Sequence, residues 1–176
     1  MKSKINELKT AIKYYGSKNF LLTCMASFLF IVSCTNTKMI ADNEKMMRGD
    51  WTITDVSVDG IQESQVDITV FDEAKSQCFE GSTWHLVQNN ASGNYTLQGG
   101  TDCPSATTKI KWFITETDGQ YYFNFKKIYE GERPKNVVDG YKMRVASNTG
   151  SSIVLEQELT FEGKPLSVFY TFNKNQ

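Results

Sequence analysis

Polar and apolar residues alternate with a period of two along most of the chain beyond residue 50, and turn residues interrupt the alternation about every ten positions. Such alternation is typical of strands with one buried face, whereas amphipathic helices repeat every 3.6 residues. The pattern predicts strands over 51–58, 66–71, 79–87, 94–97, 109–114, 120–129, 141–145, 153–161 and 166–172. About nine short strands with almost no helix indicate an antiparallel barrel or sandwich.

Several local signals refine this pattern. Asp118 and Gly119 form a hairpin signal of the type that needs positive φ. Asp55 breaks the alternation of the first strand, as a bulge would. Residues 71–77 are long enough for one helical turn, and residues 132–136 are the expected irregular insertion because Pro134 lacks a backbone donor.

The first 34 residues follow a different pattern. Five lysines and one acid precede Phe20–Val32, a run of 13 apolar-dominated residues, and the sequence turns polar after Cys34. A basic segment, an apolar core and a small residue before a cysteine are typical of a secretory signal. Residues 31–34 resemble a bacterial lipobox, in which the cysteine is lipidated and becomes the mature N-terminus.

Three alternatives compete with this interpretation. A membrane-spanning helix needs ~20 apolar residues, and this run is shorter and contains Thr23, Cys24 and Ser27. A buried core helix would follow five lysines and precede a strand-rich domain, and an ordinary signal cut elsewhere would leave Cys34 unmodified. We favour a lipoprotein signal peptide over 1–33, a lipidated cysteine with a flexible tether over 34–46, and a barrel domain over 47–176.

Charge limits the classes of partner. Removing residues 1–33 would leave 143 residues, enough for one domain with a sizeable core, with 14 basic and 19 acidic residues. This negative balance argues against nucleic acid, whose binding depends on basic surfaces, and against attraction to anionic lipid headgroups. Membrane attachment should therefore come from the lipid on Cys34. By resemblance, the bacterial modification carries several acyl chains, palmitate among them, and several chains hold firmly.

Two cysteines remain in the predicted mature domain once Cys34 carries lipid. In an exported, oxidising compartment, the pair Cys78 and Cys103 predicts a disulfide. Closing a loop of roughly 26 residues would contribute ~3.5 kcal/mol in the chain-entropy model. Two free thiols or a metal site are the alternatives, but zinc would want further His or Cys ligands.

A family resemblance rests on short motifs. Gly49, Asp50 and Trp51 open the first strand and resemble the GxW signature of lipocalins. Residues 46–174 are similar to lipocalin-like domain lipoproteins of Bacteroidetes-type bacteria. This similarity rests on the GxW-like start together with the lipobox, the tether and the segments 79–84, 93–96 and 103–104. The resemblance implies an all-β, antiparallel, up-and-down eight-stranded barrel whose cavity can hold a small apolar molecule.

Placing the apolar phase of each strand inward gives a bulky, aromatic-rich interior. An eight-stranded barrel is just wide enough for side chains to fill it or to enclose one small ligand, so a plain core and a ligand-lined cavity both remain open. The candidate cavity-lining residues are Trp51, Trp84, Trp112, Tyr121, Phe123, Tyr141, Gln157 and Tyr170.

The sequence contains few residues in patterns that suggest catalysis. His85 is the only histidine, and its side chain should point to the face of the strand opposite that of Trp84. We therefore expect it to be exposed and without an acid–base partner. No phosphate-binding glycine loop or His-rich ligand set is present in the sequence, so we expect no cofactor, no metal and no enzyme activity. Lys126, Lys127, Lys142 and Arg144 are expected to form a small solvated basic patch.

Two functions follow from these expectations. The first is a lipid-anchored binding protein of the bacterial cell envelope, on the outer membrane, holding a small hydrophobic molecule in its barrel. The alternative is a non-catalytic interaction subunit whose filled barrel docks on an envelope protein partner such as an outer-membrane complex. For the alternative, the outward phase offers exposed aromatic residues that would mark an interface: Phe79, Phe113, Tyr122 and Phe169.

Overall fold

The computed structural model describes residues 37–60, 67–132 and 140–176. The chain divides into two compact units, Met1–Met39 and Ile40–Gln176, and the described strands all belong to the second. The predictions that concern the leader and Cys34 lie outside the described residues, and so does most of the insertion expected over 132–136.

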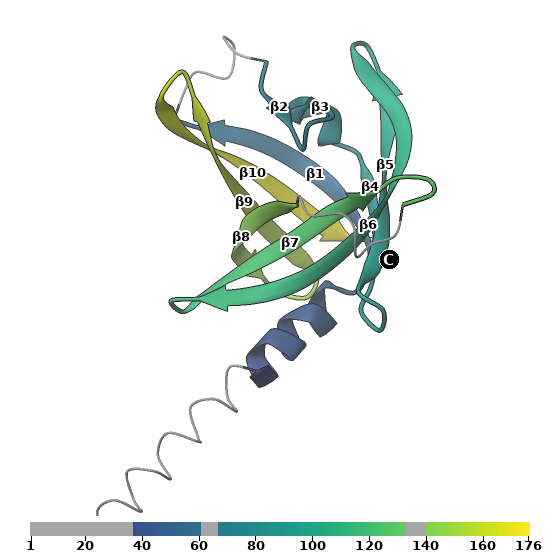
Figure 1. The fold of residues 1–176 in the computed structure, drawn as a ribbon, viewed down its shortest axis with the longest axis vertical. Helices are drawn as coiled ribbons and strands as arrows, with labels where there is room; N and C mark the ends of the chain where they lie inside the picture. Colours follow the sequence, from purple (N-terminus) through teal and green to yellow (C-terminus); the bar gives the residue numbers. More distant parts are fainter. Residues whose placement is uncertain (1–36, 61–66, 133–139) are drawn as a thin grey trace, which may run out of the picture. The chain divides into compact units, whose positions relative to one another are not determined.

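Eight strands form a closed antiparallel barrel in which β1 and β4 to β10 follow one another around the wall, and β10 pairs with β1 (Figure 1). This order confirms the predicted up-and-down, eight-stranded, lipocalin-like barrel. The barrel strands are β1 (Gly49–Asp59), β4 (Thr83–Val87), β5 (Ser92–Gly100), β6 (Cys103–Thr117), β7 (Gln120–Ile128), β8 (Tyr141–Asn148), β9 (Ser152–Phe161) and β10 (Lys164–Lys174).

Each strand contributes one row of side chains to the interior, because successive side chains of a strand point to opposite faces. In β7, Phe123 and Phe125 are buried, whereas Tyr122 and Asn124, which alternate with them, are partly exposed. The same alternation buries the predicted inward rows of the other strands. The largest fully buried side chains of the wall include Trp51, Trp84, Trp112, Tyr95, Tyr170, Phe123 and Phe125.

Two hairpin turns have the backbone that their sequences predict. φ is 53° at Asp118 and 77° at Gly119 between β6 and β7, and 49° at Glu162 and 77° at Gly163 between β9 and β10. Positive φ at both central residues is the mark of the tight turn that suits the twist of two neighbouring strands.

The predicted bulge at Asp55 is confirmed. The register between β1 and β10 shifts between Ile53 and Asp55. After the extra residue, Val56 and Val58 take the inward phase and pack against the core.

The connection between β1 and β4 carries a second, small sheet. β2 (Thr69–Val70) pairs antiparallel with β3 (Ala74–Lys75), and the 3₁₀ helix η2 (Ser76–Phe79) follows. We call residues 67–79 the plug segment. The helical turn expected over 71–77 forms later, because residues 71–73 make the turn between β2 and β3.

Residues 37–47 are helical, which differs from the flexible tether expected over 34–46. From Ile40 onward the helix packs on the barrel: Met47 is fully buried, and the indole N–H of Trp51 donates to the Met47 carbonyl oxygen at 2.7 Å. The Ile114 N–H also donates to Glu44 Oε1 at 3.4 Å. A helix this short is only marginally stable in isolation, and these contacts with the barrel therefore account for its formation.

These helix contacts lie at the start of β1 and toward the end of β6. The plug segment lies at the opposite end of the barrel, because it follows the last residues of β1 and is bonded to Cys103 at the start of β6. Among the described residues, no helix combines the length and apolar character needed to traverse a bilayer.

Candidate functional site

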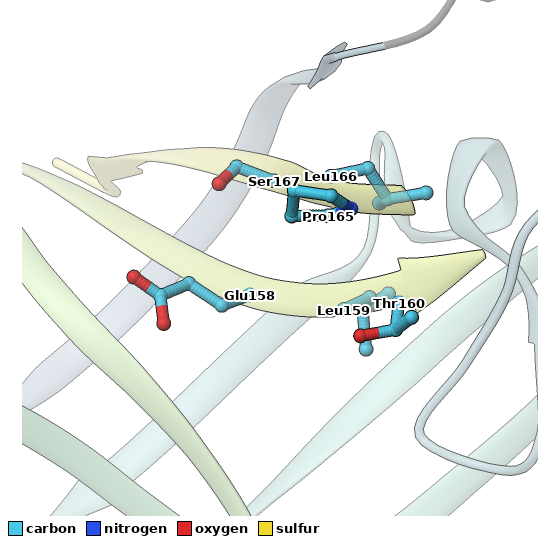
Figure 2. A pocket seen from close by; sticks show the side chains of 6 residues that line it. All are labelled: Glu158, Leu159, Thr160, Pro165, Leu166 and Ser167. Carbon is cyan, nitrogen blue, oxygen red and sulfur yellow. The ribbon is translucent and has the colours of Figure 1, made fainter. Parts of the chain in front are cut away.

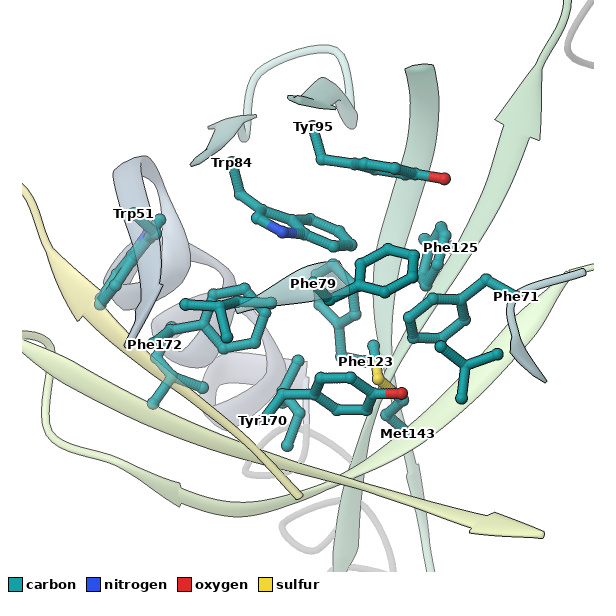
Figure 3. Close-up of a cluster of buried hydrophobic side chains, with 14 of the residues drawn as sticks. Trp51, Phe71, Phe79, Trp84, Tyr95, Phe123, Phe125, Met143, Tyr170 and Phe172 are labelled. Atoms are coloured by element: carbon teal, nitrogen blue, oxygen red, sulfur yellow. The ribbon is translucent and has the colours of Figure 1, made fainter. Parts of the chain in front are cut away.

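The interior of the barrel is a cluster of aromatic rings (Figure 3). Trp84 of β4 stacks on Tyr95 of β5 with ring centroids 4.6 Å apart. The Trp84 indole also meets Phe125 at 5.6 Å and Phe172 at 5.5 Å, edge to face in both cases. Aromatic pairs favour these offset and edge-on arrangements, so the rings form a specific apolar lining rather than a loose core.

Two rings of this cluster, Phe71 and Phe79, come from the plug segment rather than from the wall. The Phe71 ring lies 5.0 Å from Phe79, 5.1 Å from Phe125, 5.2 Å from Tyr141 and 5.5 Å from Tyr170. Phe71 is 2% exposed, so the plug segment inserts a phenyl ring among the wall aromatics (Figure 3).

The turn that carries Phe71 has an unusual backbone. φ is 53° at Phe71 and 48° at Asp72, and both residues carry a Cβ. Non-glycine residues in the left-handed region are uncommon, more so when the side chain is bulky, and they persist only where surrounding contacts hold them. The contacts around Phe71 must therefore offset this cost.

Two wall side chains hold the main chain of this turn. The Lys127 ammonium donates to the Phe71 carbonyl oxygen at 2.6 Å, and the Tyr141 hydroxyl donates to the same oxygen at 2.7 Å. The Tyr141 hydroxyl also lies 3.1 Å from Asp72 Oδ2. Lys127 is on the inward phase of β7, two residues beyond Phe125, so an ammonium stands at the edge of an aromatic interior.

The Glu73 carboxylate completes a buried polar cluster with Lys127. Its Oε2 lies 3.2 Å from Lys127 Nζ and accepts a hydrogen bond from the Tyr95 hydroxyl, and Thr108 Oγ1 lies 3.5 Å from Oε1. The side chains of Lys127 and Glu73 are only 7% and 16% exposed. Buried charges need such partners, because an unpaired one loses its hydration without compensation.

The environment shifts the ionisation of the wall groups in this cluster. Burial, and then the neighbouring Glu73 carboxylate, raise the pKa of Tyr95 far above its usual value. Burial is also the main cause of the raised pKa of Tyr141. Burial lowers the pKa of Lys127, but hydrogen bonding to Tyr129 and Glu73 outweighs it, so that the net shift is upward. At neutral pH the cluster therefore holds one ammonium and neutral phenols, all of them hydrogen-bond donors.

The predicted disulfide is confirmed. Cys78 and Cys103 are bonded, with Cα atoms 5.4 Å apart and a sequence separation of 25. The bond joins η2 to the first residue of β6. It therefore fixes the C-terminal part of the plug segment to the barrel wall.

The candidate cavity-lining residues divide by their place in the barrel. Tyr141 and Tyr170 contact the Phe71 ring, and Trp84 stacks on the Tyr95 ring. Gln157 is 7% exposed, and its Oε1 accepts a hydrogen bond from the Tyr170 hydroxyl at 3.0 Å. Tyr141, Tyr170 and Gln157 thus belong to the plugged half of the interior, Trp84 lies opposite Trp51 in the register of β1 and β4, and the role of all four in lining a cavity stays a prediction.

The other four candidates lie toward the end that the helix contacts. Trp51 donates to Met47, and the Trp112 indole N–H donates to the Ser92 carbonyl oxygen at 2.9 Å. Phe123 stacks on Trp112 with centroids 5.7 Å apart, and Tyr121 is partly buried against the core. The structure thus brings only part of the predicted set to the plug.

Two predictions of exposed residues are wrong. Phe79 is fully buried, because η2 interrupts the period of two on which its outward phase was counted. Lys127 is also buried rather than part of a surface patch. Arg144 is paired with Glu156, so Lys126 and Lys142 are the remaining members of that patch.

His85 is exposed, as predicted. Its Nδ1 lies 2.6 Å from Asp50 Oδ1, a partner that the sequence did not suggest, and both side chains are about half exposed or more. The pair lies on the outer phase of β4 and β1. In the part of the chain that the structure describes, no group of three or more His, Cys, Asp or Glu side chains is placed to hold a metal ion.

The surface hollows formed by described residues include two on the barrel wall. A groove of about 680 Å³ runs along the β9–β10 hairpin at the plugged end (Figure 2). A hollow of about 240 Å³ lies over β6, β7 and the start of β8. The first is lined by Glu158, Leu159, Thr160, Pro165, Leu166 and Ser167, and the second by Phe113, Asn124, Phe125, Lys126, Gly140, Tyr141 and Lys142.

Comparisons with known proteins show a remote structural likeness. No protein-family model matches the chain, and no curated protein matches it. Among solved structures, the complex of bovine odorant binding protein with a selenium-containing odorant aligns over 76% of this chain and 73% of its own, with 12% sequence identity and a TM-score of 0.39. A likeness this distant carries no information about ligand or function. The chain's own geometry defines it as a closed, up-and-down, eight-stranded barrel of the lipocalin-like kind, with an aromatic interior and a plug segment at one end.

Proposed function

We propose that the barrel binds a small hydrophobic molecule in its interior, and that lipid on Cys34 attaches the protein to the bacterial outer membrane. The observation that carries the binding proposal is the Phe71 ring. It belongs to a segment that is not part of the barrel wall, and it is surrounded by aromatic side chains of β7, β8 and β10.

A barrel whose interior is completed by a separate segment can exchange that segment for another apolar group. Without the Phe71 ring, the wall residues Phe125, Tyr141 and Tyr170 would border an apolar space of aryl size. Apolar spaces in proteins stay dry and accept apolar guests of matching size. Small-molecule sites are typically lined in this way, by aromatic residues with a few polar groups that fix orientation.

The binding proposal is tested with protein purified from its native membrane. Extraction with organic solvent followed by mass spectrometry should recover a small molecule in stoichiometric amount. The recovered compound should then raise the melting temperature of the recombinant barrel. The Phe125→Leu variant, which alters the interior, should weaken this stabilisation, whereas Phe113→Leu on the outer phase of β6 should leave it unchanged. Repeatedly empty extracts would contradict the proposal.

Attachment is tested separately. Cys34→Ser should release the protein from membranes into the soluble fraction, and mass spectrometry of the wild-type N-terminus should find an acylated cysteine. A Cys24→Ser variant is the matched control, because Cys24 lies inside the predicted leader and should be removed with it. Membrane retention of Cys34→Ser would contradict the anchor.

The outer face of β6 to β8 favours a second candidate function, docking on an envelope protein. Phe113 is 47% exposed beside the 240 Å³ hollow, and Lys142 Nζ lies 3.8 Å from the Tyr122 ring centroid. Exposed aromatic residues with adjacent cations are common at interfaces. A photo-crosslinker placed at Phe113 should then capture one dominant partner in native membranes, and a crosslinker at Thr96 on β5 should not.

A further inference from the structure

We infer that the ligand of the barrel is an amphiphilic anion, an apolar body with a carboxylate-like head, and that the plug segment occupies its place in the structure. This inference rests on the proposed function and names the chemical class of the molecule. It comes from the groups that the plug segment and the barrel wall present to each other.

The plug segment presents three groups within three consecutive residues. The Phe71 ring enters the aromatic interior, the Phe71 carbonyl oxygen accepts from Lys127 and Tyr141, and the Glu73 carboxylate accepts from Tyr95 and lies beside Lys127 (Figure 3 shows the ring). Together these groups have the chemistry of an arylalkanoic acid: an aromatic body followed by acceptor oxygens, with the Glu73 carboxylate beside the Lys127 ammonium.

The wall presents the complementary set. Lys127 Nζ, the Tyr95 and Tyr141 hydroxyls and Thr108 Oγ1 come from β5 to β8, and each lies within hydrogen-bond distance of an oxygen of Phe71 or Glu73. Hydrogen-bond donors at the edge of an apolar interior need acceptor atoms as partners, because apolar groups cannot accept a hydrogen bond. The wall is thus built to receive oxygen atoms at this position, whichever molecule supplies them.

The buried ammonium decides the charge of the ligand. Lys127 is 7% exposed, and Glu73 is the carboxylate placed beside it in the described part of the chain. A molecule that displaces the plug segment and fills the interior keeps water from Lys127 but removes Glu73 from it. A neutral molecule would leave the ammonium without a counterion, which is strongly unfavourable, whereas an anionic head restores the pair.

The plug segment has features that would allow a ligand to displace it. Its strands pair over only two positions, Thr69 with Lys75 and Val70 with Ala74, and its turn holds two non-glycine residues at positive φ. The Cys78–Cys103 bond keeps its C-terminal end on the wall, so displacement would involve the residues before Cys78. The tethered segment would then act as an intramolecular competitor that raises the concentration of ligand needed for binding.

The test compares ω-phenylalkanoates of graded chain length with the corresponding ω-phenylalkanols by isothermal titration calorimetry at neutral pH. The oxidised wild-type barrel should bind the best acid about tenfold to a hundredfold more tightly than its alcohol, the range expected when a charged hydrogen bond is gained. Glu73→Gln should strengthen acid binding, because it weakens the internal competitor and leaves Lys127 without its anion. Alcohol binding should strengthen by a similar factor in the same variant, because the plug segment competes with both series, so the preference for the acid should be kept.

Lys127→Met should abolish the preference for the acid, while Lys126→Met makes the same charge change on the outward phase of the same strand and should preserve it. Binding of neither series to wild type or Glu73→Gln would overturn the proposed function together with this inference. Equal binding of acid and alcohol in both proteins would overturn the inference alone and leave the apolar site standing. Should Lys127→Met fail to fold, tighter binding of the acid than of the alcohol in both wild type and Glu73→Gln supports the inference, and equal binding overturns it.

Discussion

Removing the disulfide between Cys78 and Cys103 should destabilise the barrel by about 3.5 kcal/mol. The bond joins two cysteines with a sequence separation of 25, and the loss of chain entropy in the unfolded state gives this magnitude for a loop of that length. The compact unit Ile40–Gln176 has an unfolding entropy of about 0.3 kcal/mol/K at ~2.1 cal/mol/K per residue, so the melting temperature should fall by about 12 °C.

Urea unfolding followed by tryptophan fluorescence measures this effect. The double variant Cys78→Ala/Cys103→Ala is compared with oxidised wild type and with wild type held in a thiol reductant. The reduced wild type controls for packing, because it loses the cross-link but no atoms of the buried Cys78 side chain. Both should lose about the same stability, and the urea dependence should become steeper because the unfolded chain exposes more surface without its cross-link.

The local response is equally specific. The disulfide holds η2 on β6, so amide exchange in the plug segment should accelerate more than exchange in β9 and β10, which lie away from the bond. The reasoning is refuted if reduced wild type loses less than about 1 kcal/mol, or if exchange accelerates uniformly. Either result would mean that the cross-link does not act through the loop it closes.

Three further predictions concern single side chains. Phe71→Ala should lower the unfolding free energy in urea by roughly 3 kcal/mol, because the ring contacts are lost. Phe71→Gly should lower it by up to about 1 kcal/mol less than Phe71→Ala does, because φ is 53° at this position and glycine tolerates positive φ. Equal losses in the two variants would argue against backbone strain. The contribution of the buried phenols to stability should be constant below about pH 10 and fall above it, because burial raises the pKa of Tyr95 and Tyr170 in the folded state while the phenols of the unfolded chain ionise first. In urea unfolding between neutral pH and about pH 11, Tyr95→Phe should make the fall in stability shallower. Trp51→Phe should cost about 1–2 kcal/mol and accelerate amide exchange over residues 40–47, because the indole donor to the Met47 carbonyl is lost; unchanged exchange would mean that the helix is held in another way.

The barrel could be predicted from sequence because its wall obeys a simple period. Inward residues such as Trp84, Phe123 and Leu155 alternate with outward ones, and the turn at Asp118 and Gly119 has a composition with one favoured backbone. The bulge at Asp55 was visible as a break in the same period. Patterns within one strand and one turn depend on local physical chemistry, which the sequence contains directly.

The plug could not be predicted in the same way, because its position depends on contacts between distant segments. Phe71 and Glu73 meet Tyr95, Lys127 and Tyr141 only after the barrel has closed. The one available signal was Lys127, which continues the inward phase of Phe123 and Phe125. A lysine on a buried phase indicates a buried partner, and following that phase would have pointed to an acidic residue outside the wall.

The helical residues 40–47 also depended on tertiary contacts. Ile40 and Met47 are the members of this segment that pack against the core, and two residues seven apart do not make a convincing amphipathic pattern. The boundary of the compact unit at Ile40, rather than near residue 47, follows from these contacts.

The same end of the barrel is where a lipid anchor would connect to the wall. The chain joins the wall through Ile40 to Met47 at the pole opposite Phe71. For the acylated protein proposed above, the covalent connection to the lipid would therefore reach the barrel without passing through the plug segment, so displacement of the plug segment would not require movement of the anchored end.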